Sequence, residues 1–238
     1  MDKQSKIIDM FNKIAPTYDK ANRAMSLGMD VGWRKVACSY ILSKYINRDL
    51  SIVDVACGTG DMVGLWASMA KGYNANLSKL IGVDPSSGML LEAKAKFPEH
   101  EFIEADANDL TLEDNIFDVL SISFGIRNVV EREEALKEFN RVLKIGGYAV
   151  VLEFTKTDRR GLFDIARDTY IKKVLPKIGE FISKDKEAYE YLPNSIDTFL
   201  SRENFIEELK GAGFEIEHIE SFSFNACTLF VAKKIKNL

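Results

Sequence analysis

Acidic residues and glycines follow short apolar runs in the first half of the chain. The stretch 53–62, VDVACGTGDM, has an acid and a glycine-rich turn directly after such a run, and Asp84, Asp106 and Ser123 follow three further runs. Glycines let a backbone approach a ligand closely, and a carboxylate at a strand end can accept hydrogen bonds from ribose hydroxyls. These residue types in this order predict a site for a ligand that contains a nucleoside.

The glycine-rich turn argues against two common nucleotide sites. Val63 stands where the fingerprint G-x-G-x-x-G would need its third glycine after Gly58 and Gly60, and Gly64 comes one residue late. No lysine follows the turn as it does in a P-loop, and a carboxylate at Asp84 would repel a 2′-phosphate. Once these two sites are excluded, S-adenosylmethionine fits the pattern. It needs a backbone that approaches it closely, a hydrogen-bond acceptor for the ribose and one for the adenine, and it needs no phosphate-binding loop.

Composition narrows the class of protein further. The chain has 238 residues, 46% of them hydrophobic, which is enough for one large α/β domain, and its net charge of -4 does not favour a nucleic-acid partner. Three cysteines without a CxxC pair and two histidines predict neither a disulfide framework nor a metal site. No segment is typical of a signal peptide or is apolar enough to span a bilayer, so we expect a cytoplasmic protein.

The chain alternates between strand and helix patterns. Apolar runs predict strands at 51–56, 80–84, 101–106, 117–125 and 146–154, and helical spacing predicts helices at 61–71, 87–97 and 131–144. A capped helix at 201–214 precedes two strands, 215–224 and 227–234, with only a short loop between them. Single helices between strands imply parallel, right-handed connections. We therefore expect an α/β fold with a seven-stranded, mostly parallel, doubly wound sheet that ends in an antiparallel hairpin, the layout of class I methyltransferases.

Two segments lie outside this alternation. Helical patterns at 6–15 and 30–46 flank a polar stretch in which Pro16 and Gly28 are expected to interrupt the helix. We interpret residues 1–47 as a helical lid and residues 156–200 as an insertion on the acceptor side, within one domain that spans 1–238.

Five segments carry a resemblance to a known family. They read YDKANRAMSLGMDVGWRK, DVACGTGDM, SISFGIRN, FNRVLKIGGYAVVLEF and YEYLPNSI. In this order they resemble the ubiquinone/menaquinone biosynthesis C-methyltransferase family, from about Phe11 to the C-terminus. The resemblance implies transfer of a methyl group from S-adenosylmethionine to a ring carbon of a polyprenylated hydroquinone, with demethylmenaquinol favoured over the ubiquinone-precursor benzoquinol.

The resemblance and the strand-end pattern together give the expected donor site. By position, the family's donor-binding residues match Thr59, Asp84, Asp106 with Ala107, and Ser123. The family often has Met at Ala21 and His at Asp30, and some members have Asn at Asp106. With the acid and glycines of the turn added, the expected cofactor-binding residues are Asp54, Gly58, Thr59, Gly60, Asp84, Asp106, Ala107 and Ser123, and no metal is expected.

Arg127 is the expected catalytic residue, because it follows the fourth strand directly on the donor side. A phenol is about three pH units from ionising at neutral pH, which is about 4 kcal/mol, and one well-placed donor is worth about 3–4 kcal/mol. Arg127 would thus stabilise the phenolate while water or a carboxylate removes the proton; the structural alternative is an ion pair with Glu131 or Glu133. Asn128 would orient the same oxygen or cap the following helix.

The N-terminal segment supplies the remaining expected substrate contacts. Tyr18, Asp19 and Asn22 fall where a lid over the site would begin, although a simple turn with Tyr18 packed as an aromatic is the alternative. Two other functions stay open: a methyltransferase for another small aromatic, and a scaffold subunit that binds donor or lipid without catalysis.

The segment 156–177 suggests how a prenylated acceptor could be reached. Seven cations stand against three acids there, with apolar residues at helical spacing. This pattern suits a helix on the inner face of an anionic membrane, but it suits a pocket wall packed on the sheet more often. A homodimer is compatible with the sequence, which does not determine the assembly.

Overall fold

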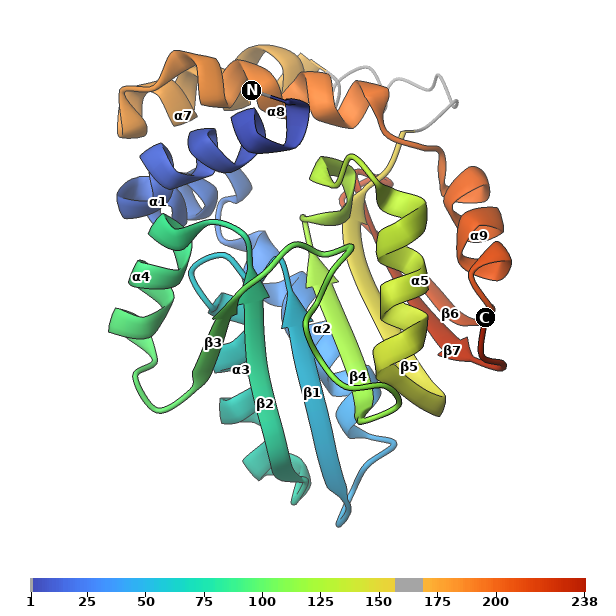
Figure 1. Ribbon diagram of the computed structural model, residues 1–238. Coiled ribbons are helices and arrows are strands. Elements are labelled where there is room, and N and C mark those ends of the chain that lie inside the picture. The colour runs from blue at the N-terminus through green and yellow to red at the C-terminus, as the bar shows by residue number, and fades with distance from the viewer. Residues whose placement is uncertain (1, 157–168) are drawn as a thin grey trace.

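The computed structural model describes residues 2–156 and 169–238, and a single seven-stranded sheet runs through them (Figure 1). The strand order is β3-β2-β1-β4-β5-β7-β6, and β7 is antiparallel to both β5 and β6 while the other pairs are parallel. The strands are β1 (Asp49–Val55), β2 (Asn76–Asp84), β3 (Glu101–Glu104), β4 (Phe117–Ser123), β5 (Leu143–Phe154), β6 (Phe214–Phe222) and β7 (Cys227–Lys234). The expected mostly parallel sheet with a C-terminal antiparallel hairpin is confirmed.

The helices fall into three layers. They are α1 (Lys3–Ser26), α2 (Met29–Leu42), α3 (Asp61–Ala70), α4 (Ser87–Lys96), α5 (Arg132–Val142), α7 (Leu175–Ser183), α8 (Lys186–Thr198) and α9 (Arg202–Gly211). Short helical turns are η1 (Lys71–Tyr73), η2 (Ile126–Asn128) and the π-type η3 (Tyr170–Val174). Figure 1 shows α5 and α9 on the near face of the sheet, α2 and α3 behind it, and α1, α7 and α8 across its upper edge.

The sheet is buried on both faces because successive apolar residues along each strand point alternately to one face and to the other. In β1, Val53 and Val55 join the core under α5 and α9, whereas Leu50 and Ile52 join the core under α2 and α3. Trp66 of α3 is fully buried in the second of these cores. Such near-continuous apolar strands are typical of a parallel sheet with helices on both sides.

The third layer has its own core across the carboxyl ends of the strands. Ile14 and Ala21 of α1 pack there with Leu175 of α7 and Tyr189 of α8. The crossing of α7 and α8 needs a glycine, because a Cβ on Gly179 would lie 2.0 Å from the Tyr189 ring. These contacts hold α1 over the end of the sheet where the polar residues of the strands emerge.

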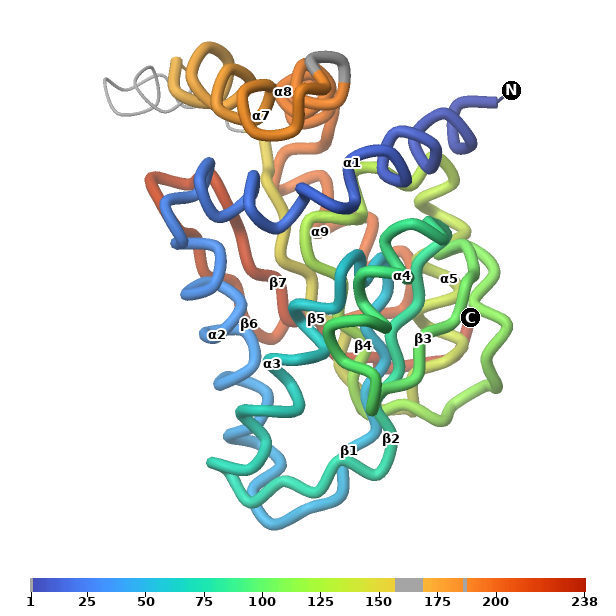
Figure 2. Tube along the Cα trace, turned by 90° about the vertical axis from the view of Figure 1, so that its left-hand side faces the viewer, coloured from blue at the N-terminus to red at the C-terminus, as the bar shows by residue number. Residues whose placement is uncertain are grey.

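One expectation about helices is wrong. Helix α1 continues through Pro16 to Ser26, and only Gly28 lies in a break, the turn before α2. A proline removes the hydrogen bond to the carbonyl four residues earlier, here that of Asn12, and Figure 2 shows α1 bent part-way along instead of broken. Residues 105–116 between β3 and β4 contain no helix.

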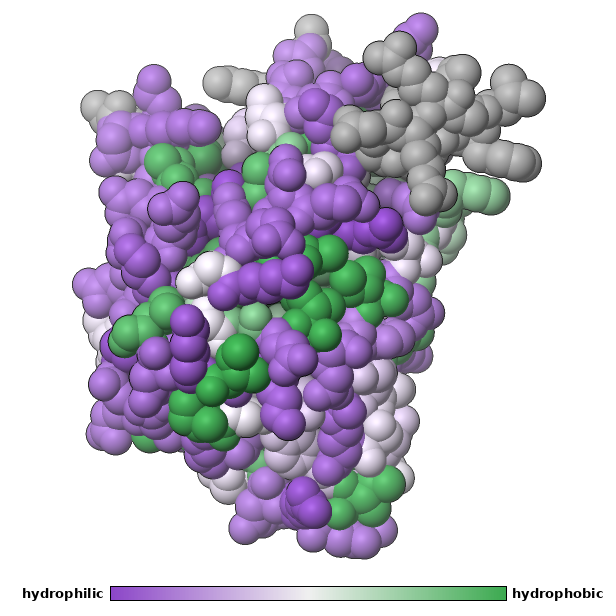
Figure 3. Space-filling view, turned by 90° about the vertical axis from the view of Figure 1, so that its right-hand side faces the viewer, coloured by the Kyte–Doolittle hydropathy of each residue, from purple (hydrophilic) through white to green (hydrophobic). Residues whose placement is uncertain are grey.

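The later part of the chain contains helices that the pattern analysis did not separate. Helices α7 and α8 fall within the expected insertion at 156–200, and residues 157–168 of the basic segment 156–177 lie outside the described residues. In the described ranges, no helix is both long and apolar enough to cross a bilayer. The face in Figure 3 is mostly hydrophilic, with apolar residues in a few separate patches.

Candidate active site

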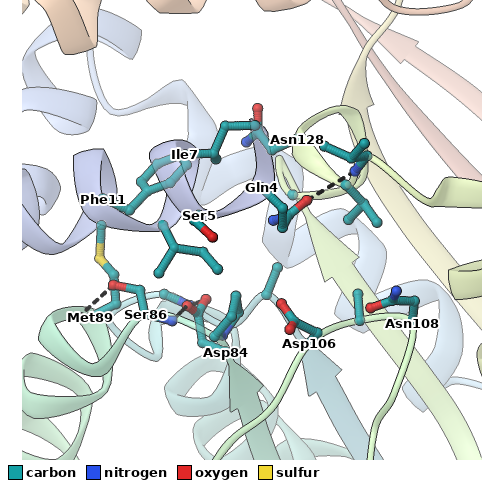
Figure 4. Close-up of a pocket in the computed structure, with 18 of the residues that line it drawn as sticks. Gln4, Ser5, Ile7, Phe11, Asp84, Ser86, Met89, Asp106, Asn108 and Asn128 are labelled. Atoms are coloured by element: carbon teal, nitrogen blue, oxygen red, sulfur yellow. Dashed lines mark hydrogen bonds between the residues drawn. The ribbon is translucent and has the colours of Figure 1, made fainter. Parts of the chain in front are cut away.

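A cavity of about 410 Å³ lies between α1 and the carboxyl ends of the strands. Figure 4 shows its two sides: Gln4, Ile7 and Phe11 of α1 lie above, and Asp84 and Asp106 rise from the strand ends below. Ligands of open α/β sheets bind beyond these strand ends, and the volume falls within the range of about 300–1,000 Å³ typical of small-molecule sites. The cavity is therefore the candidate active site.

The glycine-rich turn after β1 forms part of the cavity floor. Gly58 and Gly60 have φ angles of +55° and +82°, so the tight turn relies on conformations that other residues adopt at a cost. Asp84 fixes the turn, because its carboxylate accepts hydrogen bonds from the backbone N–H of Gly58 and of Ser86, each at 2.8 Å. Burial raises the pKa of Asp84 to about 6 despite these hydrogen bonds. Gly58 and Asp84 both line the cavity, as expected.

Three more of the expected donor residues line the cavity. Asp106 and Ala107 follow β3, and Ser123 ends β4. Burial, and then the neighbouring Asp109, raise the pKa of Asp106. The cavity thus presents two carboxylates and close backbone on one side.

Asp54 occupies a different place from these residues. It is 1% exposed within β1 and accepts a hydrogen bond of 2.6 Å from Ser121, whose oxygen also accepts one of 3.0 Å from the Trp66 indole. Burial raises the pKa of Asp54 to about 7. Asp54 alternates along β1 with the same set as Leu50 and Ile52, so its side chain points to the face of the sheet that α3 covers, beneath the glycine-rich turn.

Thr59 connects the turn to α1. Its hydroxyl donates to Asp19 at 2.5 Å, and Lys96 of α4 binds both Asp19 and Asp61, each at 2.6 Å. Arg23 of α1 pairs with Asp61 as well. Thr59, Asp19 and Lys96 line a smaller cavity of about 260 Å³. Gly60 begins α3 and, like Thr59, is not among the described residues that line the larger cavity.

Two amide side chains of α1 that the sequence analysis missed also hold this helix in place. The Asn12 oxygen accepts hydrogen bonds from the Ser86 hydroxyl at 2.7 Å and from the Gly88 backbone at 2.8 Å, at the start of α4. The Gln4 oxygen accepts one of 3.0 Å from the Val130 backbone. An asparagine in an amphipathic helix gives no signal of such a contact, because its partners come from a distant element.

Arg127 is buried in an ion pair at the end of the sheet. Its Nη1 donates to Glu153 at 2.8 Å and to the carbonyl of Phe124 at 2.5 Å, and its Nε donates to Ser195 of α8 at 3.2 Å. Glu153 is 0% exposed, and burial raises its pKa against the opposing effect of Arg127. The partner of Arg127 is thus an acid of β5, not one at the start of α5.

Two of the remaining expected substrate residues, Asn128 and Tyr18, belong to the larger cavity. Asn128 lines the cavity and accepts a hydrogen bond of 3.1 Å from Tyr191 of α8. It does not cap the following helix, because it is the last residue of η2 and the N-cap residue of α5 is Glu131. Tyr18 also lines the cavity, and burial raises its pKa while a hydrogen bond to Asn22 opposes the rise.

The donor groups of the cavity fit S-adenosylmethionine. Asp84 retains carboxylate lone pairs for ribose hydroxyls, Asp106 and Ala107 offer acceptor and backbone groups for an adenine, and Gly58 allows close approach. In the described ranges, no three histidine, cysteine or acidic side chains converge as metal ligands would.

Comparison with known proteins agrees with this geometry. The chain is 59% identical over 235 residues to the ubiquinone/menaquinone biosynthesis C-methyltransferase UbiE of Campylobacter jejuni (strain 81116), covering 99% of this chain and all of the relative. It is 41% identical over 232 residues to the demethylmenaquinone methyltransferase of Chlorobaculum tepidum, covering 97% of this chain and 93% of the relative.

The fold has solved counterparts as well. The crystal structure of a SAM-dependent methyltransferase from Aquifex aeolicus matches with a TM-score of 0.57 and 16% identity, over 83% of this chain and 89% of that one. The sequence profile of the ubiE/COQ5 methyltransferase family matches residues 1–234. The chain therefore belongs to the ubiE/COQ5 methyltransferase family.

Proposed function

We propose that this protein methylates a ring carbon of a polyprenylated hydroquinone with S-adenosylmethionine as the donor, and that demethylmenaquinol is its acceptor. The names of the Campylobacter and Chlorobaculum relatives support quinone biosynthesis as the setting. The observation that carries the proposal is the cavity in which Asp84, Asp106 and the Gly58 turn face α1 at the carboxyl ends of the strands.

In this proposal, the strand ends hold the donor. The Asp84 carboxylate accepts from the ribose hydroxyls, Asp106 and Ala107 bind the adenine, and Ser123 contributes at the end of β4. Thr59 acts through Asp19, which keeps α1 on the turn. Residues 1–47 then serve as the lid, because α1 supplies the upper wall of the cavity and is held at the Asn12 and Asp19 contacts.

When bound, S-adenosylmethionine supplies a methyl group on a positively charged sulfur. The chain has to make the acceptor carbon nucleophilic by favouring loss of the proton from the neighbouring hydroxyl. Arg127 supports this role as a cation that cannot itself lose a proton, held by Glu153 beside Asn128 and Phe124. A guanidinium in a site of low dielectric stabilises a developing phenolate more strongly than it would in water.

The acceptor's prenyl chain gives a reason for contact with a membrane. We propose that the described residues 169–177, with helices α7 and α8 of the expected insertion at 156–200, face the acceptor and the bilayer in a peripheral arrangement, and that two copies of the chain pair in solution. Lys172 and Lys173 of this segment are exposed in η3, and Lys172 forms an ion pair with Asp197 of α8. Cations at such exposed positions can approach anionic headgroups.

Methyl transfer to defined acceptors tests the proposal. The purified protein is incubated with labelled S-adenosylmethionine and, in parallel, reduced demethylmenaquinol, the reduced ubiquinone-precursor benzoquinol and a simple phenol of similar ring size. We expect label in the demethylmenaquinol ring. Transfer to the benzoquinol alone would reassign the acceptor, and donor binding without transfer to any of the three would contradict the proposed reaction.

A further inference from the structure

Four aromatic side chains form a continuous wall beside the donor cavity. Trp33 of α2 lies at the centre, with ring-centroid distances of 6.1 Å to Phe222, 6.3 Å to Phe124 and 6.4 Å to Phe154. Phe124 and Phe154 are 5.0 Å apart. We refer to Trp33, Phe124, Phe154 and Phe222 as the aromatic wall. Of the four, Phe124 is buried, and the other three keep more of their surface accessible.

Two buried guanidinium groups lie over the inner rings of the aromatic wall. Arg34 is 5.1 Å from the centroid of Phe124, and Arg127 is 5.7 Å from that of Phe154. Each has one acid as a partner, Asp30 for Arg34 and Glu153 for Arg127. A planar, electron-rich ring that carries oxygen atoms matches such a combination of aromatic faces and cations.

The inner end of the aromatic wall opens on the donor cavity. Phe124 belongs both to the wall and to the cavity lining. Its φ angle is +61°, a region that a bulky residue rarely adopts and that is found at functional sites when the surroundings impose it. The charges of Arg34 and Arg127 both oppose the rise that burial causes in the pKa of Tyr18, another residue that lines the cavity.

The outer end of the aromatic wall reaches two turns that present apolar side chains. Leu27 lies between α1 and α2 and is 77% exposed, and Phe224 lies between β6 and β7 and is 64% exposed. Both have left-handed backbones, with φ angles of +53° and +58°. The turns lie side by side (Figure 2), where the Ser223 hydroxyl is 3.6 Å from the sulfur of Met29.

We infer that the aromatic wall is the acceptor site: the hydroquinone ring lies against Trp33, Phe124 and Phe154 between Arg34 and Arg127, and the prenyl tail leaves across Phe222 between the two turns. This inference rests on the proposed function and adds where the acceptor ring binds, how it is oriented, and that Arg34 is a second cation beside it. It assigns roles to Trp33 and Arg34, which are neither strand-end residues nor part of the lining of the donor cavity. The left-handed turns then bring apolar side chains to the point where a tail would meet lipid.

Tryptophan fluorescence tests the ring position without requiring turnover. The chain has two tryptophans, and Trp66 is fully buried in the core under α3. A Trp66→Phe variant therefore emits only from Trp33, and a Trp33→Phe variant only from Trp66. We expect a naphthoquinone with a short isoprenoid tail to quench most of the emission of Trp66→Phe and little of that of Trp33→Phe. Equal quenching of the two variants, or no quenching of Trp66→Phe, would overturn the inference.

Kinetics with the reduced quinol test the rest of the inference. Trp33→Leu should raise the acceptor KM about tenfold, while the Kd for S-adenosylmethionine stays unchanged. Leu27→Asn keeps a residue that tolerates a left-handed backbone and should raise KM only for quinols that carry a tail. Leu91→Gln, at a leucine of α4 that is 69% exposed, is the matched control and should change neither constant.

The outcomes separate this inference from the proposed function. Methyl transfer without quenching of Trp33 and without a tail-dependent effect of Leu27→Asn would overturn the acceptor site and leave the reaction standing. Quenching of Trp33 without transfer to any quinol would overturn the reaction and leave a quinone-binding wall. Thermal melting of each variant shows whether a lost signal reflects unfolding.

Discussion

Donor affinity should depend on pH through the carboxylate of Asp84. Burial raises its pKa to about 6, so the carboxyl takes up a proton as the pH falls through that value. Only the ionised form can accept from both ribose hydroxyls while it accepts from Gly58 and Ser86. The ionised fraction falls from about nine-tenths at pH 7 to about one-tenth at pH 5, so the apparent Kd should rise about tenfold.

Calorimetric titration of S-adenosylmethionine at about pH 5, 6 and 7 measures this effect. Asp84→Asn should bind about 10- to 150-fold more weakly at pH 7, since a hydrogen bond to a charged group is worth about 1.5–3 kcal/mol, and its Kd should no longer follow pH. Glu104→Gln, at an exposed acid that ends β3, is the charge-matched control. A pH-independent Kd in the unmodified protein, or wild-type affinity in folded Asp84→Asn, would refute the ribose role.

Three further predictions concern turnover, the lid and stability. Arg127→Lys keeps the charge but loses the planar fork; it should slow methyl transfer at least about tenfold with an unchanged donor Kd, and a wild-type rate across pH 7 to 9 would contradict the phenolate role. Gly88→Ala places a Cβ 3.0 Å from the Asn12 carbonyl oxygen and should lower stability by about 1–3 kcal/mol, seen as a lower Tm and faster amide exchange in α1; unchanged exchange there would show that α1 docks without this contact. Asp54 has a folded-state pKa of about 7 against an ordinary value of 3.8. The folded protein should therefore lose about 1.4 kcal/mol of stability for each pH unit between about 4 and 7, because the buried carboxyl is more stable when it is neutral. The free energy of unfolding of Asp54→Asn should therefore rise relative to that of the wild type as the pH rises over this range. A constant difference between the two proteins at each pH would show that the carboxyl does not titrate there.

The sequence predicts the sheet well because its signals are local. Each strand reads as a short apolar run, and Ser201 caps α9 through the backbone of Asn204 as its position before a helical pattern indicates. The ends of several elements shift by a few residues, and β5 begins earlier, at Leu143. The break predicted at Pro16 is wrong, because a long helix tolerates one missing hydrogen bond when both of its halves pack on a common core.

The site is predicted less completely, because its contacts join segments far apart in the chain. Asp54 illustrates a signal that was present: its even position in β1 already assigns it to the face under α3. The pairing of Arg127 with Glu153, and that of Asn128 with Tyr191, had no such signal. Glu153 reads as one polar residue at the end of an apolar strand, and Tyr191 stands in a helix whose position over η2 depends on the whole third layer.

The upper wall of the cavity has a consequence for the order in which the molecule is assembled. Helix α1 is made before the strands, yet it packs on α7 and α8, which are made after β5. Its contacts with α7 and α8 close a loop of most of the described chain, and contacts of such sequence separation form late. A nascent chain that has reached β5 can therefore dock α1 on α4 and on the turn after β1, but it lacks the core that α1 shares with α7 and α8. Donor binding should therefore strengthen, and α1 should become more resistant to protease, once α7 and α8 have been made.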